Sequence, residues 1–293
     1  MSLRWSSQYI DASKVCKAFD SRLVSVGLAN LTTQLVDELK PMFFDVSPFK
    51  DTISWLFASH LLGSWLVEHF DNKCKLFNVL PELVSSGPWQ GGSPVHGAAW
   101  RVALDVPSRN ATSFWQSILK VCSCGSNLNH VTQCLHGSGH GVMKVVMMPY
   151  RKASPACSAE PRPGAHLLYE KRSSLLTQGI QMLKSAPGDV QSYAVWGFYE
   201  EFFKVIESNW PVSSPTPRDS HAIAACSFVE YYPQACFFYA FEWIALVRYV
   251  PRQGAITLLR GMCDTVAMRE DNRQECKNAL NTLSMLNEQH RWA

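Results

Sequence analysis

The sequence has no apolar run long enough to cross a bilayer and no dense cluster of basic residues. Its longest apolar stretches, 55–67 and 236–247, fall short of the roughly 20 residues that a membrane-spanning helix needs, and they contain His60 and Glu242. The 293 residues include 27 Lys and Arg and 24 Asp and Glu, so a net charge of +3 is spread thinly. We therefore expect no membrane span and no nucleic-acid partner, since the latter needs a concentrated basic surface.

The signatures of several common enzyme classes are also missing. The sequence contains no Gly-x-Ser-x-Gly elbow, no Walker loop and no His-Glu-x-x-His zinc motif. Its Gly137-x-Gly139-x-Gly141 segment lacks the spacing of a dinucleotide-binding fingerprint. Hydrolase and nucleotide-dependent functions therefore have no local motif behind them.

Ten cysteines and two glycosylation sequons, at Asn30 and Asn110, favour a secreted protein or one in an organelle lumen. Residues 1–20 carry no apolar core of a signal peptide. Two explanations stay open: either a signal has been removed, or the cysteines are buried thiols.

Apolar residues recur at spacings of three and four, as in 53–65 and 198–206, whereas alternating strand-like runs are scarce. This pattern predicts an all-α protein. Helix start signals occur at Ser47-Pro48, Ser93-Pro94 and Pro187-Gly188-Asp189. We expect an N-terminal helical cap at 1–46 and a helical-repeat domain at 47–293, with a proline-rich insertion at 149–164.

A repeat of roughly 40 residues runs through the chain, with one interval near 60 residues that contains the proline-rich insertion. This period is typical of stacked helix pairs, so we expect an array of about six helix hairpins, open or closed into a toroid. We number the repeat from one anchor residue in each unit. The anchors are Ser54, Pro94, Cys134, Ala194, Cys236 and Cys276.

Two positions of this repeat carry polar or aromatic side chains, and a third is mostly small. Four of the six residues three places after the anchor are Gly or Ala, which would let neighbouring helices approach closely. Six places after the anchor lie His60, Trp100, His140, Glu200, Glu242 and Thr282. Two places after it lie Leu56, His96, His136, Trp196, Phe238 and Asn278.

The segment His136-Gly-Ser-Gly-His140-Gly is the sharpest local signal. Residues four apart on a helix share one face, so the two imidazoles suit a metal or polar ligand. Each helical glycine costs about 1 kcal/mol relative to alanine, which calls for a compensating role. The glycines either expose backbone to a ligand or permit a tight helix crossing in which the histidines hydrogen-bond to carbonyls.

If the sixth-position residues face one interior wall, imidazoles and carboxylates converge there. Such ligands suit iron or zinc, and we expect the metal ligands to be His60, His136, His140, Glu200 and Glu242. The simpler alternative is that the glutamates pair with Arg101, Arg248 or Lys204. Because consecutive helical residues point in different directions, we expect Glu201 to be a solvated surface charge.

Three cysteine pairs each end on an anchor and span a turn-forming segment. We expect hairpin disulfides between Cys124 and Cys134, between Cys226 and Cys236, and between Cys263 and Cys276. The sequence does not pair the other four cysteines. Such linked helix pairs, with the segment 134–142, resemble secreted Sel1-type repeats, although the period here is longer and the Leu-Gly and Tyr positions of that family are absent.

Two functions follow as hypotheses. The first is a binding protein whose inner face holds a protein partner or a small ligand, contacted by His96, Trp100, His136 and Trp196. The second is a metal-dependent enzyme of oxygenase or hydrolase type, in which iron or zinc activates oxygen or water.

Overall fold

All regular elements of the computed structural model are α-helices. The structure describes residues 12–26, 50–83, 93–106, 110–149, 168, 170–207, 218–248 and 259–288, and no strand occurs in these ranges. The prediction of an all-α protein is therefore confirmed. Most of 1–46 and of the proline-rich segment 149–164 lies outside the described residues, so both of those boundaries stay predictions.

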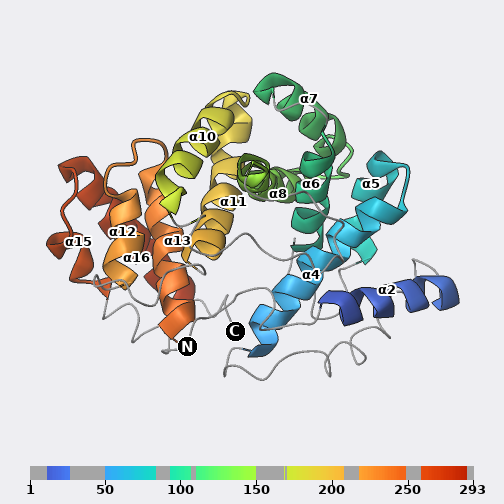
Figure 1. Cartoon of the computed structure of the whole chain (residues 1–293), viewed down its shortest axis with the longest axis horizontal. Coiled ribbons are helices and arrows are strands. Elements are labelled where there is room, and N and C mark those ends of the chain that lie inside the picture. The colour runs from blue at the N-terminus through green and yellow to red at the C-terminus, as the bar shows by residue number, and fades with distance from the viewer. Residues whose placement is uncertain are drawn as a thin grey trace.

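Six helices pack one against the next in chain order and form a central row. They follow an arch in Figure 1, from α4 through α6, α8 and α11 to α13. Each anchor residue of the sequence repeat lies on a different helix of this row. The row consists of α4 (Lys50–His69), α6 (Ser93–Asp105), α8 (Leu128–Met147), α11 (Gly188–Glu207), α13 (Pro233–Arg248) and α16 (Glu270–Glu288).

The other helices flank this row, and most are shorter. Each packs on a row helix next to it in the chain: α2 on α4, α5 on α6, α7 on α8, α10 on α11, α12 on α13 and α15 on α16. In Figure 1, α5, α7 and α15 lie on the outer side of the arch. Their bounds are α2 (Ala12–Val26), α5 (Lys73–Leu83), α7 (Ala111–Cys122), α10 (Arg172–Lys184), α12 (Arg218–Cys226) and α15 (Met262–Thr265).

Local sequence signals explain where several helices begin. The Asn110 side chain accepts hydrogen bonds from the first-turn amides of α7, and Asn127 accepts one from the His130 amide of α8. These N-caps satisfy backbone donors that have no partner within the helix. Two of the three predicted starts are also found, since α6 begins at Ser93 and α11 at Gly188, and the third, Ser47-Pro48, lies outside the described residues.

Glycines lie where the row helices cross. A Cβ atom added at Gly97 would overlap the carbonyl oxygen of His60, and one added at Gly197 would overlap that of His136. A Cβ at Gly139 would likewise meet the carbonyl oxygen of Ala194. The small residues predicted to allow close approach therefore sit in backbone contacts between α4 and α6 and between α8 and α11. These crossings bring side chains of successive helices within reach of one another.

Three of the four disulfides within the described residues join consecutive helices. The predicted bonds Cys226–Cys236 and Cys263–Cys276 are present. The predicted Cys124–Cys134 bond is wrong, because Cys134 bonds to Cys122 and Cys124 bonds to Cys74. Cys122 is the last residue of α7 and is buried toward α8, whereas Cys124 lies beyond the helix end and reaches α5. The two disulfides thus link the end of α7 to α8 and the turn that follows α7 to α5.

None of the described helices is both long and apolar enough to span a membrane.

Candidate functional site

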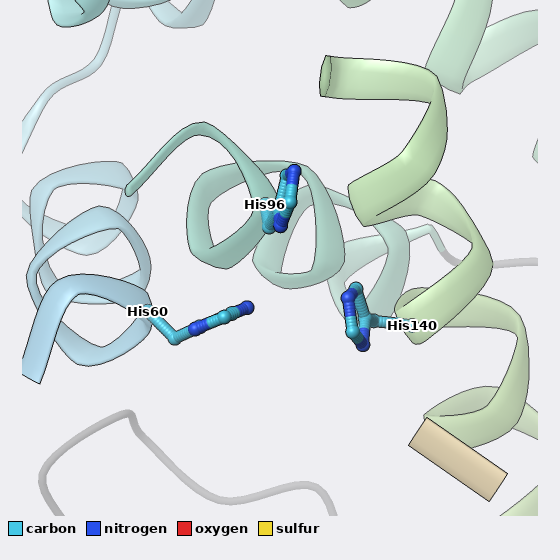
Figure 2. Close-up of side chains that lie close together, drawn as sticks. All are labelled: His60, His96 and His140. Carbon is cyan, nitrogen blue, oxygen red and sulfur yellow. The ribbon is translucent and has the colours of Figure 1, made fainter. Parts of the chain in front are cut away.

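Four imidazoles from three successive row helices meet at the α4, α6 and α8 crossings. The ring centroids of His96 and His136 are 4.4 Å apart, those of His60 and His140 5.3 Å, and those of His60 and His96 5.5 Å. Figure 2 shows His60, His96 and His140 around a common space between their helices. His140 is fully buried and His60 nearly so, while His96 and His136 are half-buried. We call these four residues the histidine cluster.

The sequence positions of the histidines explain the cluster. His136 and His140 are one helical turn apart on α8, so their rings lie on one face with centroids 5.2 Å apart. The Gly97 crossing brings α4 against α6, and Gly137 lies against the backbone of His96 on α6. The glycines of the His136–Gly141 segment thus permit tight helix crossings, and the histidines meet because of those crossings.

Two carboxylates of α11 join the cluster from the next helix along the row. The Nε2 atom of His136 lies 2.9 Å from Oε2 of Glu200, whose other oxygen accepts a hydrogen bond from Lys204. The Nδ1 atom of His140 lies 3.2 Å from Oε2 of Glu201. We call His136, Glu200 and Lys204 the Glu200 network.

The second carboxylate overturns one prediction. Glu201 is buried rather than solvated, and its Oε1 accepts a 2.7 Å hydrogen bond from Lys144. The close α8–α11 crossing at Gly197 lets two consecutive glutamates reach different turns of α8. We call His140, Glu201 and Lys144 the Glu201 network. The predicted alternative of a Glu–Lys pair is also found, because Glu200 pairs with Lys204.

Both carboxylates are held in the ionised form. Burial raises the pKa of Glu200, but Lys204 and the two α8 histidines outweigh it and bring the pKa well below its usual range. Burial likewise raises the pKa of Glu201, and Lys144 and His140 more than reverse that effect. The same ion pairs keep Lys204 charged, because Glu200 and Glu201 overcome the lowering of its pKa by burial.

Two of the imidazoles, those of His96 and His140, are held in the neutral form. Burial, followed by the neighbouring His136, lowers the pKa of His96 well below its usual range. Burial also lowers the pKa of His140, although Glu200 and Glu201 act in the opposite direction. Neutral imidazole is the form that binds metal ions, so these two rings present lone pairs at pH 7.

Of the two predicted tryptophans, Trp100 contacts the cluster and Trp196 lies farther along the row. Trp100 stacks on His60 with ring centroids 5.4 Å apart, and the Lys144 ammonium lies 4.1 Å from its ring centroid. Trp196 is more remote, between α11 and α13, with its ring 5.3 Å from Phe238 and 5.9 Å from Tyr239. The predicted ligand-binding residues Trp100 and Trp196 thus lie on different helix pairs.

Two sets of side chains present potential ligand atoms within 4.8 Å of one another. One set is His60, His96 and His140, and the other is His136, His140 and Glu200. Four of the five predicted metal ligands belong to these sets. The fifth, Glu242, is half-buried on α13 and belongs to neither, although its charge acts on Lys204 and Tyr239.

Two residues of the site, Gln133 and Lys144, were not among the predicted ones. Gln133 hydrogen-bonds to Nε2 of His96 through its Oε1 atom, and Lys144 pairs with Glu201. A sequence signal exists for Lys144, since it follows His140 by four residues on the same helix. His96 was predicted to contact a ligand, and the structure also places it in one of the two potential metal sets.

Comparisons with known proteins give no further information about this site. No protein family model matches the chain, and no curated protein or solved structure is significantly similar to it.

Proposed function

We propose that this protein is a curved array of helix hairpins that binds a divalent transition-metal ion at the histidine cluster. The order of contacts along the row, with one anchor residue on each helix, supports a stacked repeat. Imidazole is a ligand common to zinc, iron, copper and nickel sites, and three or more imidazoles meeting among carboxylates is a typical donor set for such ions.

The single observation that carries the proposal is the environment of His140 Nε2. This atom is buried and has no hydrogen-bond partner among the described residues, and it lies 3.6 Å from Glu200 Oε2. A buried polar atom left unpaired costs on the order of 1–3 kcal/mol. A bound ion would satisfy this nitrogen, which lies beside the other potential ligand atoms.

Metal analysis of the purified full-length chain tests the proposal. After expression with zinc and iron supplied, we expect about one equivalent of one of these metals by mass spectrometry and its loss in His140→Gln. The matched control is His130→Gln, because His130 lies near the start of α8 and contacts Ser126 and Asn127 instead of the cluster. Metal-free wild-type protein that also fails to take up either ion from solution would refute the proposal.

A second candidate function is a metal-dependent enzyme that activates water or oxygen. Its supporting observation is the ionised Glu200 next to the cluster, since an adjacent carboxylate can orient or accept a proton from a metal-bound water. Zinc in the purified protein would favour the hydrolase form and iron the oxygenase form. A partner protein or small ligand on the inner face remains the prediction for a non-catalytic protein, with Trp100 and Trp196 as test positions.

The disulfides support a proposal about the compartment in which the protein resides. Four disulfides within the described residues are consistent with an oxidising environment, so we place the protein in a secreted or lumenal location. Asn110, the exposed sequon residue at the start of α7, is the position at which glycosylation would indicate a secreted or lumenal location.

A further inference from the structure

We infer that the ion binds to His60, His96 and His140, with Glu201 and Gln133 as positioning residues, and that His136 and Glu200 do not coordinate it. This inference rests on the proposed function and makes it more specific. It selects between the two sets of side chains, which share His140 and therefore cannot both use its Nε2 atom at once.

Glu201 determines which nitrogen of His140 is available. The Glu201 carboxylate is ionised and paired with Lys144, so it can only accept a hydrogen bond, and the Nδ1–H of His140 donates it. The proton on Nδ1 leaves the lone pair on Nε2, the buried atom without a hydrogen-bond partner among the described residues. A carboxylate that fixes a ligating histidine in this way is the usual support of a metal site.

Gln133 plays the corresponding part for His96. Its Oε1 atom accepts a hydrogen bond from His96 Nε2, which leaves the lone pair on Nδ1 of that ring. His60 completes the set from α4, with its ring 5.5 Å from His96 and 5.3 Å from His140. Three imidazoles from three helices therefore surround the space seen in Figure 2.

The competing set is already satisfied by internal hydrogen bonds. His136 Nε2 donates to Glu200 Oε2 at 2.9 Å, and Lys204 holds Oε1 of the same carboxylate. An ion bound to His136 and Glu200 would have to displace that proton and weaken a partly buried ion pair. The shared ligand atom, His140 Nε2, needs no such exchange, because it has no hydrogen-bond partner among the described residues. Glu200 Oε2 lies 3.6 Å from this atom, so the carboxylate would lie beside a fourth ligand such as water.

Three histidines and an open position are typical of catalytic zinc sites, where Zn–N distances are about 2.0–2.1 Å. Zn²⁺ is therefore the ion to which we commit, with Co²⁺ as its spectroscopic substitute. The ligand atoms, now within 4.8 Å of one another, would draw together by about 1 Å on binding, a shift that rotation of the side chains supplies.

The test uses the full-length chain stripped of metal by a chelator and titrated with Zn²⁺ against a chromogenic competitor. We expect His96→Gln and His60→Gln to weaken Zn²⁺ binding at least 100-fold and His136→Gln to change it less than about threefold. The positioning role of Glu201 predicts a 10–100-fold loss in Glu201→Gln, because the amide can present a donor to His140 and reverse its tautomer. Glu200→Gln, a matched change one residue away, should weaken binding less than about threefold.

A measurement on the wild-type chain makes the test independent of how well the variants fold. X-ray absorption at the zinc edge counts imidazole ligands, and the inference predicts three imidazoles with one further light atom. Circular dichroism checks that each variant is folded before its affinity is compared.

The outcomes separate the two proposals. Zinc that binds to wild-type protein, is retained by His96→Gln and is lost from His136→Gln and Glu200→Gln would overturn the inference and leave the proposed function standing. Two imidazoles with a carboxylate in the absorption spectrum would do the same. Failure of the wild-type chain to bind Zn²⁺, Co²⁺ or Fe²⁺ would overturn both.

Discussion

The Glu200 and Glu201 networks use the same three residue types on the same two helices, but they satisfy their histidines differently. His136 is bonded through Nε2, and its side chain is 18% exposed, whereas His140 is bonded through Nδ1 and is completely buried. In each network a histidine and a lysine occupy the two oxygens of the glutamate. In the second network the other nitrogen of the histidine, His140 Nε2, is buried and has no hydrogen-bond partner among the described residues. Consecutive glutamates can thus hold a partly buried ion pair and orient an interior histidine from one turn of a helix.

Removing one of the two carboxylates should have the largest effect on the free energy of unfolding, and it tests whether the two networks differ. In metal-free protein, Glu201→Ala leaves Lys144 without its buried partner, and we expect a loss of about 3–5 kcal/mol in the free energy of unfolding. Glu200→Ala should cost about 1–3 kcal/mol, because the Glu200 side chain is 15% exposed whereas that of Glu201 is 8% exposed. Urea unfolding in the presence of a chelator measures both values. Equal losses would mean that the two networks do not differ in burial as described.

Moving the helix that carries both glutamates is the next largest change. A Cβ at Gly197 would overlap the His136 carbonyl oxygen, so Gly197→Ala must push α11 away from α8. We expect a loss of about 1–3 kcal/mol in stability, as for other overpacked positions, and weaker metal binding through a displaced Glu201. Gly188→Ala is the matched control on the same helix, because no atom lies within 4 Å of a Cβ there. Thermal unfolding should distinguish the two, and identical behaviour would contradict the close crossing.

The sequence predicted the all-α fold and much of the site, and the failures have specific physical causes. His60, His140 and Glu200 come together because each lies six residues after an anchor on a helix of the row, and the row helices pack one against the next. Glu201 was misassigned because a helical wheel takes no account of side-chain length or of how closely two helices cross. The α8–α11 crossing is tight enough for two adjacent glutamates of α11 to reach α8. Cys122 was missed because the end of α7 decides which of two nearby cysteines faces α8, and periodicity fixes helix ends poorly.

Lowering the pH should destabilise the folded protein through the two imidazoles that are held neutral, those of His140 and His96. Burial lowers the pKa of His140 and His96 below the ordinary 6.5, so the unfolded chain takes up protons first as the pH falls. Stability present above pH 6.5 is therefore lost progressively below it, at up to about 1.4 kcal/mol per pH unit for each ring that stays neutral in the folded state. The two carboxylates, whose pKa values are lowered, extend the loss below pH 4.5.

Urea unfolding of metal-free protein at pH 7.5, 6.0 and 5.0 gives this slope. His140→Gln should flatten it between pH 6.5 and 5, whereas His130→Gln should leave it unchanged. A wild-type protein equally stable at all three values would show that neither ring is held neutral.

The smallest effect concerns the outer end of the Glu201 network, where Lys144 lies over the Trp100 ring. Trp100→Phe keeps an aromatic surface against His60 but weakens the attraction for the ammonium, which is strongest for indole. We expect a loss of about 0.5–1 kcal/mol in stability and less than a threefold change in Zn²⁺ affinity, because Glu201 retains its bond to Lys144. The same substitution in a Lys144→Met background should have a smaller effect on stability, and this double-mutant cycle isolates the pair from the packing of the ring. A coupling energy near zero would show that Trp100 serves only to pack His60, and the Glu201 network would then end at Lys144.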